Sequence, residues 1–179
     1  MAASFDLLEA VEALADALES KGFEPVLIGG MALVILGSQR VTRDFDFLVS
    51  TQGPRVQELV GVMYRHDLKL VTKLNAAGEV VRTGDNLRVA AARVKTESSR
   101  SLFFAHEVTG LRVDLLLDYP VPAQTLRRRA VRVKLKSRRV SVAAPEDLLK
   151  LKEIAYGHRK SPSDAEDLHF LRKLLSKNR

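Results

Sequence analysis

The sequence has no cysteine and no tryptophan among its 179 residues. The lack of cysteine excludes a disulfide framework, a thiol nucleophile and a cysteine-ligated zinc or iron–sulfur site. No apolar run reaches the roughly 18–20 residues that a membrane-spanning helix needs. The first residues also lack the basic and apolar regions of a secretory signal. We therefore expect a soluble, cytoplasmic protein that does not associate with a membrane.

Histidine is scarce, whereas positive charge is abundant. The four histidines are scattered and show no His-x-x-x-His pairing, which argues against a histidine-based metal site. Lysine and arginine number 29 against 22 acidic residues, which gives a formal net charge of +7. This balance favours a polyanionic partner, although many soluble proteins are mildly basic. With 46% hydrophobic residues, the chain can bury a full core in one domain.

Hydrophobic periodicity predicts an α/β fold (α+β) in which helices flank a mixed sheet. Apolar residues at helical spacing indicate a first helix over 4–21, with Ser4 as its N-cap. Further helices are expected over 31–36 and 54–66. Strands are expected over 25–28, 44–49, 68–74, 87–94, 101–108, 111–117, 131–136 and 140–142.

The C-terminal part of the sequence is helical in pattern. Pro145 suits the first position of a helix. Residues 163–166 read Ser-Asp-Ala-Glu, a capping box for a final helix that ends near Leu175. We expect a core domain over residues 1–143 and a helical extension over 144–179 that packs on this core.

The most informative pattern begins where a short apolar strand runs into Gly29 and Gly30, with an apolar helix directly after them. Glycine lets the backbone turn sharply and lets a ligand approach closely. The first amide groups of a helix have no acceptor within the helix, so this position favours a phosphate. A tight strand–helix turn without a ligand would show the same residues. The pattern alone leaves both interpretations open.

Two carboxylates follow on the next expected strand, in the sequence Asp44-Phe-Asp46-Phe. Residues two apart on a strand point to the same side, so both carboxylates face outward while Phe45 and Phe47 enter the core. Adjacent carboxylates repel each other unless a cation lies between them. Mg²⁺ prefers oxygen ligands and commonly takes one or two protein carboxylates together with substrate phosphates. A pair of acids on a solvated strand is the alternative.

A third carboxylate, Asp114, stands in the apolar strand segment 111–117. A buried ionised carboxylate is costly unless a cation or a hydrogen-bond donor compensates it. A salt bridge to one of the many arginines would be sufficient. If its strand instead neighbours that of Asp44 and Asp46, three carboxylates surround one or two Mg²⁺ ions. Such a site serves phosphoryl or nucleotidyl transfer, in which one carboxylate accepts the proton of the attacking hydroxyl.

These features together resemble the nucleotidyltransferase superfamily of the DNA polymerase β type. The resemblance rests on the Gly29-Gly30 turn, the spacing from it to Asp44-Phe-Asp46, and the later Val-Asp114 strand. It implies a mixed sheet flanked by helices, an NTP substrate and bound Mg²⁺. Within the superfamily, the sequence is most similar to the minimal bacterial proteins grouped with abortive-infection (AbiEii-type) nucleotidyltransferases.

The C-terminal segment strengthens the narrower likeness. Lys152, with Arg159 and an Asp164-Ala-Glu-Asp167 motif downstream, is similar to helical motifs of that group. The resemblance implies that Lys152 reaches the triphosphate or stabilises the leaving pyrophosphate. It also implies that the glycine turn holds the nucleotide phosphates: Gly29 and Gly30. The resemblance further implies that three catalytic residues are also the ligands of two Mg²⁺ ions: Asp44, Asp46 and Asp114. Of these, Asp114 would act as the base.

Several of these charged residues have simpler explanations that the sequence leaves open. Arg40 and Arg43 flank the loop before the acidic pair. Arg43 is our candidate for nucleotide binding, but both arginines would also serve merely to neutralise the two carboxylates. Lys152 would otherwise belong to a solvated helix face. Helix capping and dipole complementation would fully explain Ser163, Asp164 and Glu166.

The stretch 127–139 contains eight basic residues and no acid. Part of it alternates, so that one face of a strand would carry Arg132, Lys134 and Lys136. A polyanion along this face would release counterions on binding. Because no aromatic residue lies in the stretch, it favours contacts to a nucleic-acid backbone rather than to bases. We predict an RNA-binding surface there, with tRNA as one candidate; a solubilising face and a protein contact are the alternatives.

The sequence therefore favours a Mg²⁺-dependent enzyme that moves a nucleoside monophosphate from an NTP to an RNA end, a protein side chain or a small molecule. The resemblance admits a toxin–antitoxin-like setting, with a cognate antitoxin as a protein partner. The alternative is a catalytically silent nucleotide- or RNA-binding module with the same fold. That alternative is favoured by the basic surface and by Met31, which stands where many members of the superfamily have a serine. Only the enzyme requires the three carboxylates to converge.

Overall fold

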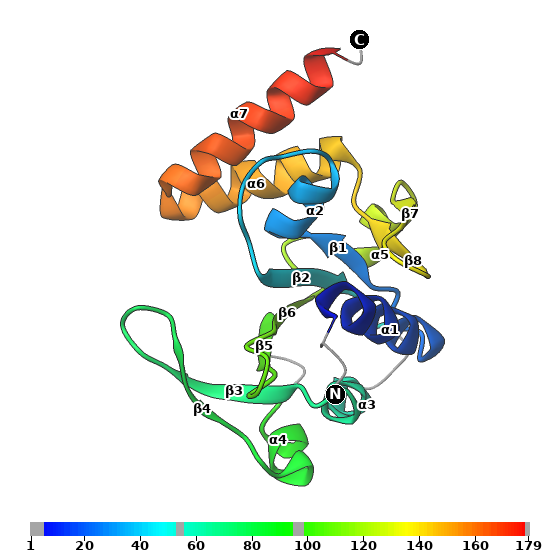
Figure 1. The fold of residues 1–179 in the computed structure, drawn as a ribbon, viewed down its shortest axis with the longest axis vertical. Helices are drawn as coiled ribbons and strands as arrows, with labels where there is room; N and C mark the ends of the chain where they lie inside the picture. Colours follow the sequence, from blue (N-terminus) through cyan, green and yellow to red (C-terminus); the bar gives the residue numbers. More distant parts are fainter. Residues whose placement is uncertain (1–5, 53–55, 95–98, 178–179) are drawn as a thin grey trace.

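The computed structural model describes residues 6–52, 56–94 and 99–177 (Figure 1). These residues form an eight-stranded sheet in the order β4-β3-β5-β6-β2-β1-β8-β7, with helices packed around it. The strands are β1 (Val26–Ile28), β2 (Asp44–Val49), β3 (Lys69–Leu74), β4 (Val80–Thr83), β5 (Ser101–Ala105), β6 (Arg112–Leu117), β7 (Val131–Lys134) and β8 (Arg139–Val142). The helices are α1 (Leu7–Ser20), α2 (Gly29–Ile35), α3 (Val56–Arg65), α4 (Leu87–Arg93), α5 (Ala123–Arg127), α6 (Pro145–Arg159) and α7 (Pro162–Lys177). The expected α/β class with a mixed sheet is confirmed.

The central strands set the geometry of the molecule. β2 runs parallel to β6 and antiparallel to β1, and β5 pairs antiparallel with β6. The β2–β6 pair joins two segments that lie far apart in the sequence. Its register places Phe45 beside Val113 and Phe47 beside Leu115, all four fully buried. The alternate residues of both strands therefore share the opposite face of the sheet.

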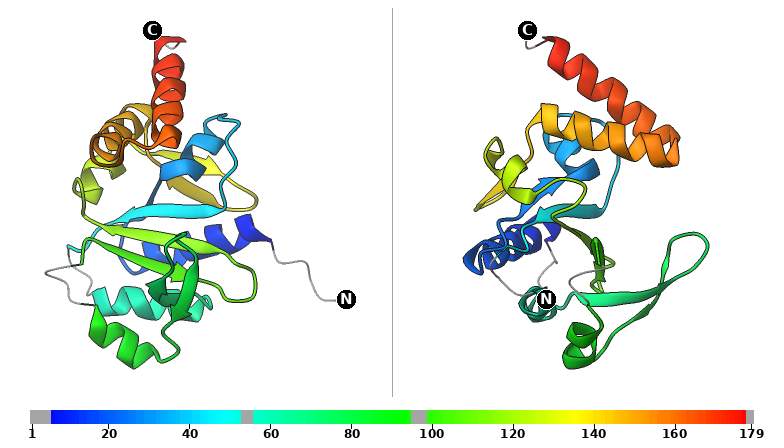
Figure 2. Two further views of the ribbon diagram at one scale, coloured as in Figure 1. Left: turned by 90° about the vertical axis from the view of Figure 1, so that its left-hand side faces the viewer. Right: turned by 180° about the vertical axis from the view of Figure 1, so that it is seen from behind.

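Helices cover the sheet unevenly. α1 and α3 contact each other and pack against the sheet, and their apolar stripes supply Leu14, Leu18, Leu59 and Met63 to the core (Figure 2). α6 and α7 pack together at the end of the molecule opposite to the β3–β4 hairpin (Figure 1). None of the helices in the described part of the chain is long and apolar enough to cross a membrane. The placement in the cytoplasm stays a prediction.

Several helices and strands differ from the predicted ones because of local capping interactions. The predicted cap Ser4 lies outside the described residues, and α1 is instead capped by Asp6, whose carboxylate accepts hydrogen bonds from the amides of Leu8 and Glu9. The strand predicted over 87–94 is wrong. This segment is the helix α4, because the Asn86 side chain accepts a hydrogen bond from the amide of Val89 and three alanines in a row follow. The sequence interpretation also missed β4 and α5.

The C-terminal helices begin where proline allows. Pro145 is at the start of α6, as predicted. The predicted capping box is wrong, since α7 already begins at Pro162 and residues 163–166 lie inside its first turns. The strand predicted over 131–136 ends at Lys134, so Lys136 lies beyond it. The strand predicted over 140–142 is confirmed as β8, which pairs antiparallel with β7. The division of the chain into residues 1–143 and 144–179 stays a prediction.

Candidate active site

The β2–β6 pair brings the three predicted carboxylates to one face of the sheet. Asp44 and Asp46 are alternate residues of β2, and Asp46 lies directly beside Asp114 of β6 in the parallel register. Asp44 lies beside Arg112 in the same register, with 3.9 Å between its Oδ1 atom and the arginine Nε atom. Phe45 and the other inward residues anchor both strands in the core, so the backbone holds the carboxylates together.

The electrostatics of the three acids indicate an uncompensated negative site. Burial, followed by the negative charge of Asp44, raises the pKa of Asp46 to about 6. Burial, followed by the charge of Asp46, raises the pKa of Asp114 to about 7. Within the described residues, the buried Oδ1 atom of Asp114 has no hydrogen-bond partner. Burial of an ionised carboxylate is unfavourable unless a proton or a cation neutralises its charge.

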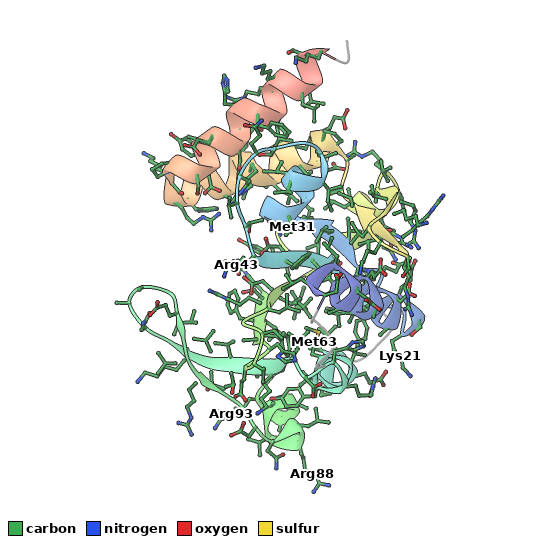
Figure 3. All side chains as sticks on the ribbon, viewed as in Figure 1. Lys21, Met31, Arg43, Met63, Arg88 and Arg93 are labelled. Atoms are coloured by element: carbon green, nitrogen blue, oxygen red, sulfur yellow. The ribbon has the colours of Figure 1, made fainter. Side chains whose placement is uncertain are left out.

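The glycine turn fits tightly against this site. Gly29 has φ +67°, and a Cβ atom there would lie 1.9 Å from the Oδ2 atom of Asp46. Ile28, the residue before it, pairs with Asp46 across the β1–β2 ladder. The backbone of the turn thus lies against the carboxylate, and only glycine leaves the necessary room. Met31 of α2, labelled in Figure 3, is 9% exposed and offers no hydroxyl to a ligand.

Of the two arginines that precede the acidic pair, the structure places Arg40 at the site. A Cβ atom on Gly30 would lie 2.9 Å from the guanidinium carbon of Arg40, so this side chain lies over the turn. The Nη1 atom of Arg40 lies 2.6 Å from the Oδ2 atom of Asp167 on α7. Arg43 is exposed at the end of the loop that leads into β2 and is not among the residues that line the cleft (Figure 3).

Lys152 of α6 is the centre of an ion network that links the last two helices. Its ammonium group lies 3.1 Å from Asp164 and 2.7 Å from Asp167, and its side chain is 13% exposed. Arg159 adds a contact of 3.1 Å to Asp164. Both aspartates are almost completely buried. The interpretation of Lys152 as part of a solvated helix face is therefore wrong. Asp164 lies in the first turn of α7, where its charge also complements the helix dipole.

These groups line one cleft of about 550 Å³. Its wall contains most of the predicted site residues, which come from α2, β2, β6 and α6: Gly29, Gly30, Asp44, Asp46, Asp114 and Lys152. It also contains residues that the sequence interpretation did not foresee, namely Arg100, Phe103 and Tyr119. Phe103 was hidden because it stands next to Phe104, and a pair of adjacent phenylalanines does not show which one faces the core.

The predicted RNA-binding residues do not line this cleft, and two of the three form ion pairs with α1 or its N-cap residue. The Nη1 atom of Arg132 lies 2.9 Å from Glu19, and the ammonium group of Lys136 lies 2.5 Å from Asp6. Lys134 is exposed on β7. Other members of the basic stretch also pair with acids, through the contacts Arg127–Glu19, Arg129–Asp147 and Arg138–Asp16. Much of the positive charge of residues 127–139 is thus compensated within the protein.

The donor set suits a divalent cation bound together with phosphates. In the described ranges, no three acidic or histidine side chains are close enough together to form a complete metal cage. The adjacent carboxylates of Asp46 and Asp114 nevertheless supply hard, anionic ligands of the kind that Mg²⁺ requires, and the Oδ1 atom of Asp114 has no partner among the described residues. Mg²⁺ commonly completes its coordination with water and substrate phosphate oxygens. The residues present therefore fit this ion.

Comparisons with known proteins support the same fold. No family model and no curated protein sequence matches the chain. Among solved structures, TM1012 of Thermotoga maritima, a proposed nucleotidyltransferase, matches 95% of this chain and 92% of its own, with 13% identity and a TM-score of 0.53. The lincosamide antibiotic adenylyltransferase LnuA, with lincomycin bound, matches 92% of this chain and 95% of its own, with 15% identity and a TM-score of 0.55. The antibiotic-resistance factor ANT(2'')-Ia matches 94% of this chain and 83% of its own, with 10% identity and a TM-score of 0.60.

The chain therefore has the nucleotidyltransferase fold, as the sequence resemblance implied. At these identities the likeness concerns the fold alone. The narrower likeness to AbiEii-type proteins stays a prediction.

The raised pKa of Asp114 predicts how stability depends on pH. An aspartate titrates near 3.8 in an unfolded chain, whereas Asp114 titrates near 7 in the folded protein. Between these values the folded protein keeps a proton that the unfolded chain has lost, so stability falls as the pH rises through this window. Asp114→Asn removes the ionisable group and with it the loss of stability that ionisation of Asp114 causes at high pH. Without divalent metal, the variant should melt at a higher temperature than the wild type at pH 8, and the difference should vanish near pH 4.

Differential scanning calorimetry in the presence of a chelator provides the measurement. Asp67→Asn makes the same chemical change at an exposed position outside the cleft. Because Asp67 has φ +56°, a conformation that asparagine favours, the variant should shift the melting temperature by a similar small amount at both pH values. Equal melting temperatures of wild type and Asp114→Asn at pH 8 would show that the ionised form of Asp114 does not destabilise the folded protein.

Proposed function

We propose that the chain is a Mg²⁺-dependent nucleotidyltransferase that transfers a nucleoside monophosphate from an NTP to an acceptor hydroxyl. The observation that supports this most directly is the pairing of Asp46 with Asp114 on neighbouring strands, against a turn that only glycine can form. Three carboxylates that line one cleft together with cations from α6 suit a site for a metal-bound triphosphate. LnuA, an adenylyltransferase by name, has the same fold.

In the proposed reaction, each group has a defined task. Asp46 and Asp114, with Asp44 beside them on β2, would hold Mg²⁺ together with phosphate oxygens, and the ion would supply positive charge that polarises the phosphate under attack. Asp114 accepts the proton of the acceptor hydroxyl through its Oδ1 atom, which has no other hydrogen-bond partner among the described residues. The acceptor oxygen then forms a bond to the α-phosphorus, and the bond from that phosphorus to the pyrophosphate oxygen breaks. Pyrophosphate leaves with its negative charge.

The cations of the cleft would bind the negatively charged phosphates of the NTP. Arg40 lies over Gly30, so it can meet phosphates that bind against the turn. Lys152 and Arg159 come from the helical extension, so residues 144–179 would form one wall of the site and residues 1–143 the other. In this proposal Lys152 also holds α6 and α7 together through its ion pairs with Asp164 and Asp167. Arg43, which is exposed outside the cleft, would meet the nucleotide only at its outer edge.

Label transfer tests the proposal. The protein is incubated with Mg²⁺ and each α-labelled NTP in turn, with total RNA, a small-molecule extract and the protein itself as acceptors. We expect label on one acceptor class, and we expect Asp46→Asn to abolish it, because removing a catalytic carboxylate costs several orders of magnitude in rate. Asp67→Asn should transfer label like the wild type. These arms also separate the RNA, protein and small-molecule acceptors that a toxin–antitoxin-like role or a resistance-like role would use.

A different result would support the alternative of a catalytically silent module. If no NTP gives label with any acceptor, while Mg²⁺ and NTP together still raise the melting temperature, the chain binds nucleotide without transferring it. If Asp46→Asn transfers label as well as the wild type, the assignment of the catalytic carboxylates is wrong.

A further inference from the structure

The cleft is electrically asymmetric along the line of its carboxylates. Three cations gather near the glycine turn: Arg40 lies over Gly30, Lys152 is joined to Arg40 through Asp167, and Arg159 shares Asp164 with Lys152. On the side of Asp114, Arg112 of the same strand lies beside Asp44 and is not among the residues that line the described cleft. Phosphates are therefore attracted to the end of the cleft that holds the glycine turn. The opposite end, beyond Asp114, is left for the molecule that gives up a proton to this residue.

The surface beyond Asp114 is aromatic and apolar. β5 pairs with β6 so that Phe103 lies directly opposite Asp114, and Ser101 lies opposite Leu116. Phe103 is 38% exposed although it sits in the middle of a strand, and Tyr119 is 36% exposed. Phe103, Leu116 and Tyr119 all line the cleft. The guanidinium carbon of Arg100 lies 4.6 Å from the centre of the Tyr119 ring, so one face of that ring is already covered.

We infer that Phe103, Leu116 and Tyr119, with Arg100 at their rim, form the acceptor subsite, and that the acceptor presents a planar or apolar ring next to its reactive hydroxyl. This inference rests on the proposed function and adds the substrate class. A ring that stacks on Phe103 is held beside the residue that lies across the ladder from it, which is Asp114. The hydroxyl next to that ring is then within reach of the proposed base.

The charges of the cleft argue against a polycationic acceptor. Of its four acidic residues, Asp164 is paired with Lys152 and Arg159. The other three carboxylates are the proposed ligands of Mg²⁺. No lining acid in the described part of the chain is then left for ammonium groups, whereas Arg100 adds a positive charge at the rim of the subsite. An acceptor that carries several ammonium groups would be repelled.

The absence of tryptophan from the chain allows a direct test. Phe103→Trp places a single fluorescent reporter in the proposed subsite. The nucleotide site is filled first with Mg²⁺ and α,β-methylene-ATP, which cannot transfer its nucleotide. Adenosine is then added as a planar, uncharged, hydroxyl-bearing probe, glucose as a hydroxyl-bearing probe without a planar ring, and kanamycin as a polycation. We expect a saturable loss of fluorescence with adenosine and no saturable change with glucose or kanamycin.

The matched control is Tyr156→Trp. Tyr156 is 37% exposed, close to the value for Phe103, and lies on α6 outside the cleft lining. Its fluorescence should respond to none of the three probes. Once the acceptor class is known from label transfer, Phe103→Ala should lower kcat/KM for the acceptor roughly tenfold, the usual effect of losing one stacking partner. The KM for the NTP should stay unchanged.

Three results would overturn the inference. Saturable quenching by kanamycin alone would indicate a polycationic acceptor. Quenching that is complete once the nucleotide analogue binds, with no further change on adding adenosine, would assign the aromatic surface to the base of the NTP. No response to adenosine would show that the surface binds no ring. The proposed function is judged separately, since it fails if Mg²⁺ and the analogue do not raise the melting temperature of the wild type.

Discussion

Gly29→Ala should remove nearly all nucleotidyl transfer and destabilise the fold. The new Cβ atom would lie 1.9 Å from the Oδ2 atom of Asp46, so either the turn or the carboxylate has to move. A residue with a side chain is also disfavoured at the observed φ of +67°, at a cost of about 1–2 kcal/mol. Displacement of a catalytic group by about 1 Å commonly costs about a hundredfold in rate. We therefore expect a loss of at least about a hundredfold in kcat/KM, with a lower melting temperature.

Gly110→Ala separates the two effects. Gly110 has a nearly identical φ of +70°, but a Cβ atom there would have no neighbour within 4 Å. It lies in the loop between β5 and β6, away from the cleft. This variant should carry the backbone cost and keep full activity. If Gly29→Ala retains the activity of Gly110→Ala, the turn does not position Asp46.

Asp167→Asn should produce the second large effect, on stability and on nucleotide binding together. The carboxylate is buried and contacts two cations, Lys152 at 2.7 Å and Arg40 at 2.6 Å. Removing one partner of a buried ion pair costs about 3–5 kcal/mol, because the remaining charge stays buried without compensation. Because Lys152 still pairs with Asp164 and Arg40 is partly exposed, we expect the free energy of unfolding to fall by about 3 kcal/mol, at the lower end of this range. The freed Arg40 no longer has a fixed place over Gly30, so the KM for the NTP should rise.

Asp147→Asn is the matched control for this effect. Asp147 is equally buried, lies on α6 and pairs with Arg129 outside the cleft. Its loss should lower the melting temperature and leave the KM for the NTP unchanged. Urea unfolding and steady-state kinetics of both variants provide the comparison. A KM that rises to the same extent in both variants would mean that nucleotide binding follows overall stability rather than the position of Arg40.

The predictions from sequence were most successful where one short segment carries the whole signal. The alternation in Asp44-Phe-Asp46-Phe placed the phenylalanines in the core and the carboxylates on the opposite face, because a strand has a side-chain period of two. The glycine turn was visible as a break between two apolar segments. Pro145 was correctly placed at the first turn of its helix, because proline lacks the amide hydrogen that a helix interior needs.

The parts of the site that depend on distant segments could not be read from the sequence. The parallel pairing that places Asp114 beside Asp46 joins strands far apart in the chain, and no local pattern specifies that register. The pairing of the basic stretch with the acids of α1 has the same character, since Arg132 and Glu19 are 113 residues apart. For that reason, the charge count of residues 127–139 overstates the free positive charge of this surface. The RNA-binding role of Arg132, Lys134 and Lys136 stays a prediction.

The central claim is that the three carboxylates and the glycine turn form one site for a metal-bound nucleotide. Calorimetric titration with α,β-methylene-ATP, with and without Mg²⁺, tests it on the wild type, Asp46→Asn and Asp67→Asn. We expect binding to the wild type and to Asp67→Asn only when Mg²⁺ is present, and little binding to Asp46→Asn under either condition. Equally tight binding without Mg²⁺, or to Asp46→Asn in its presence, would contradict the account.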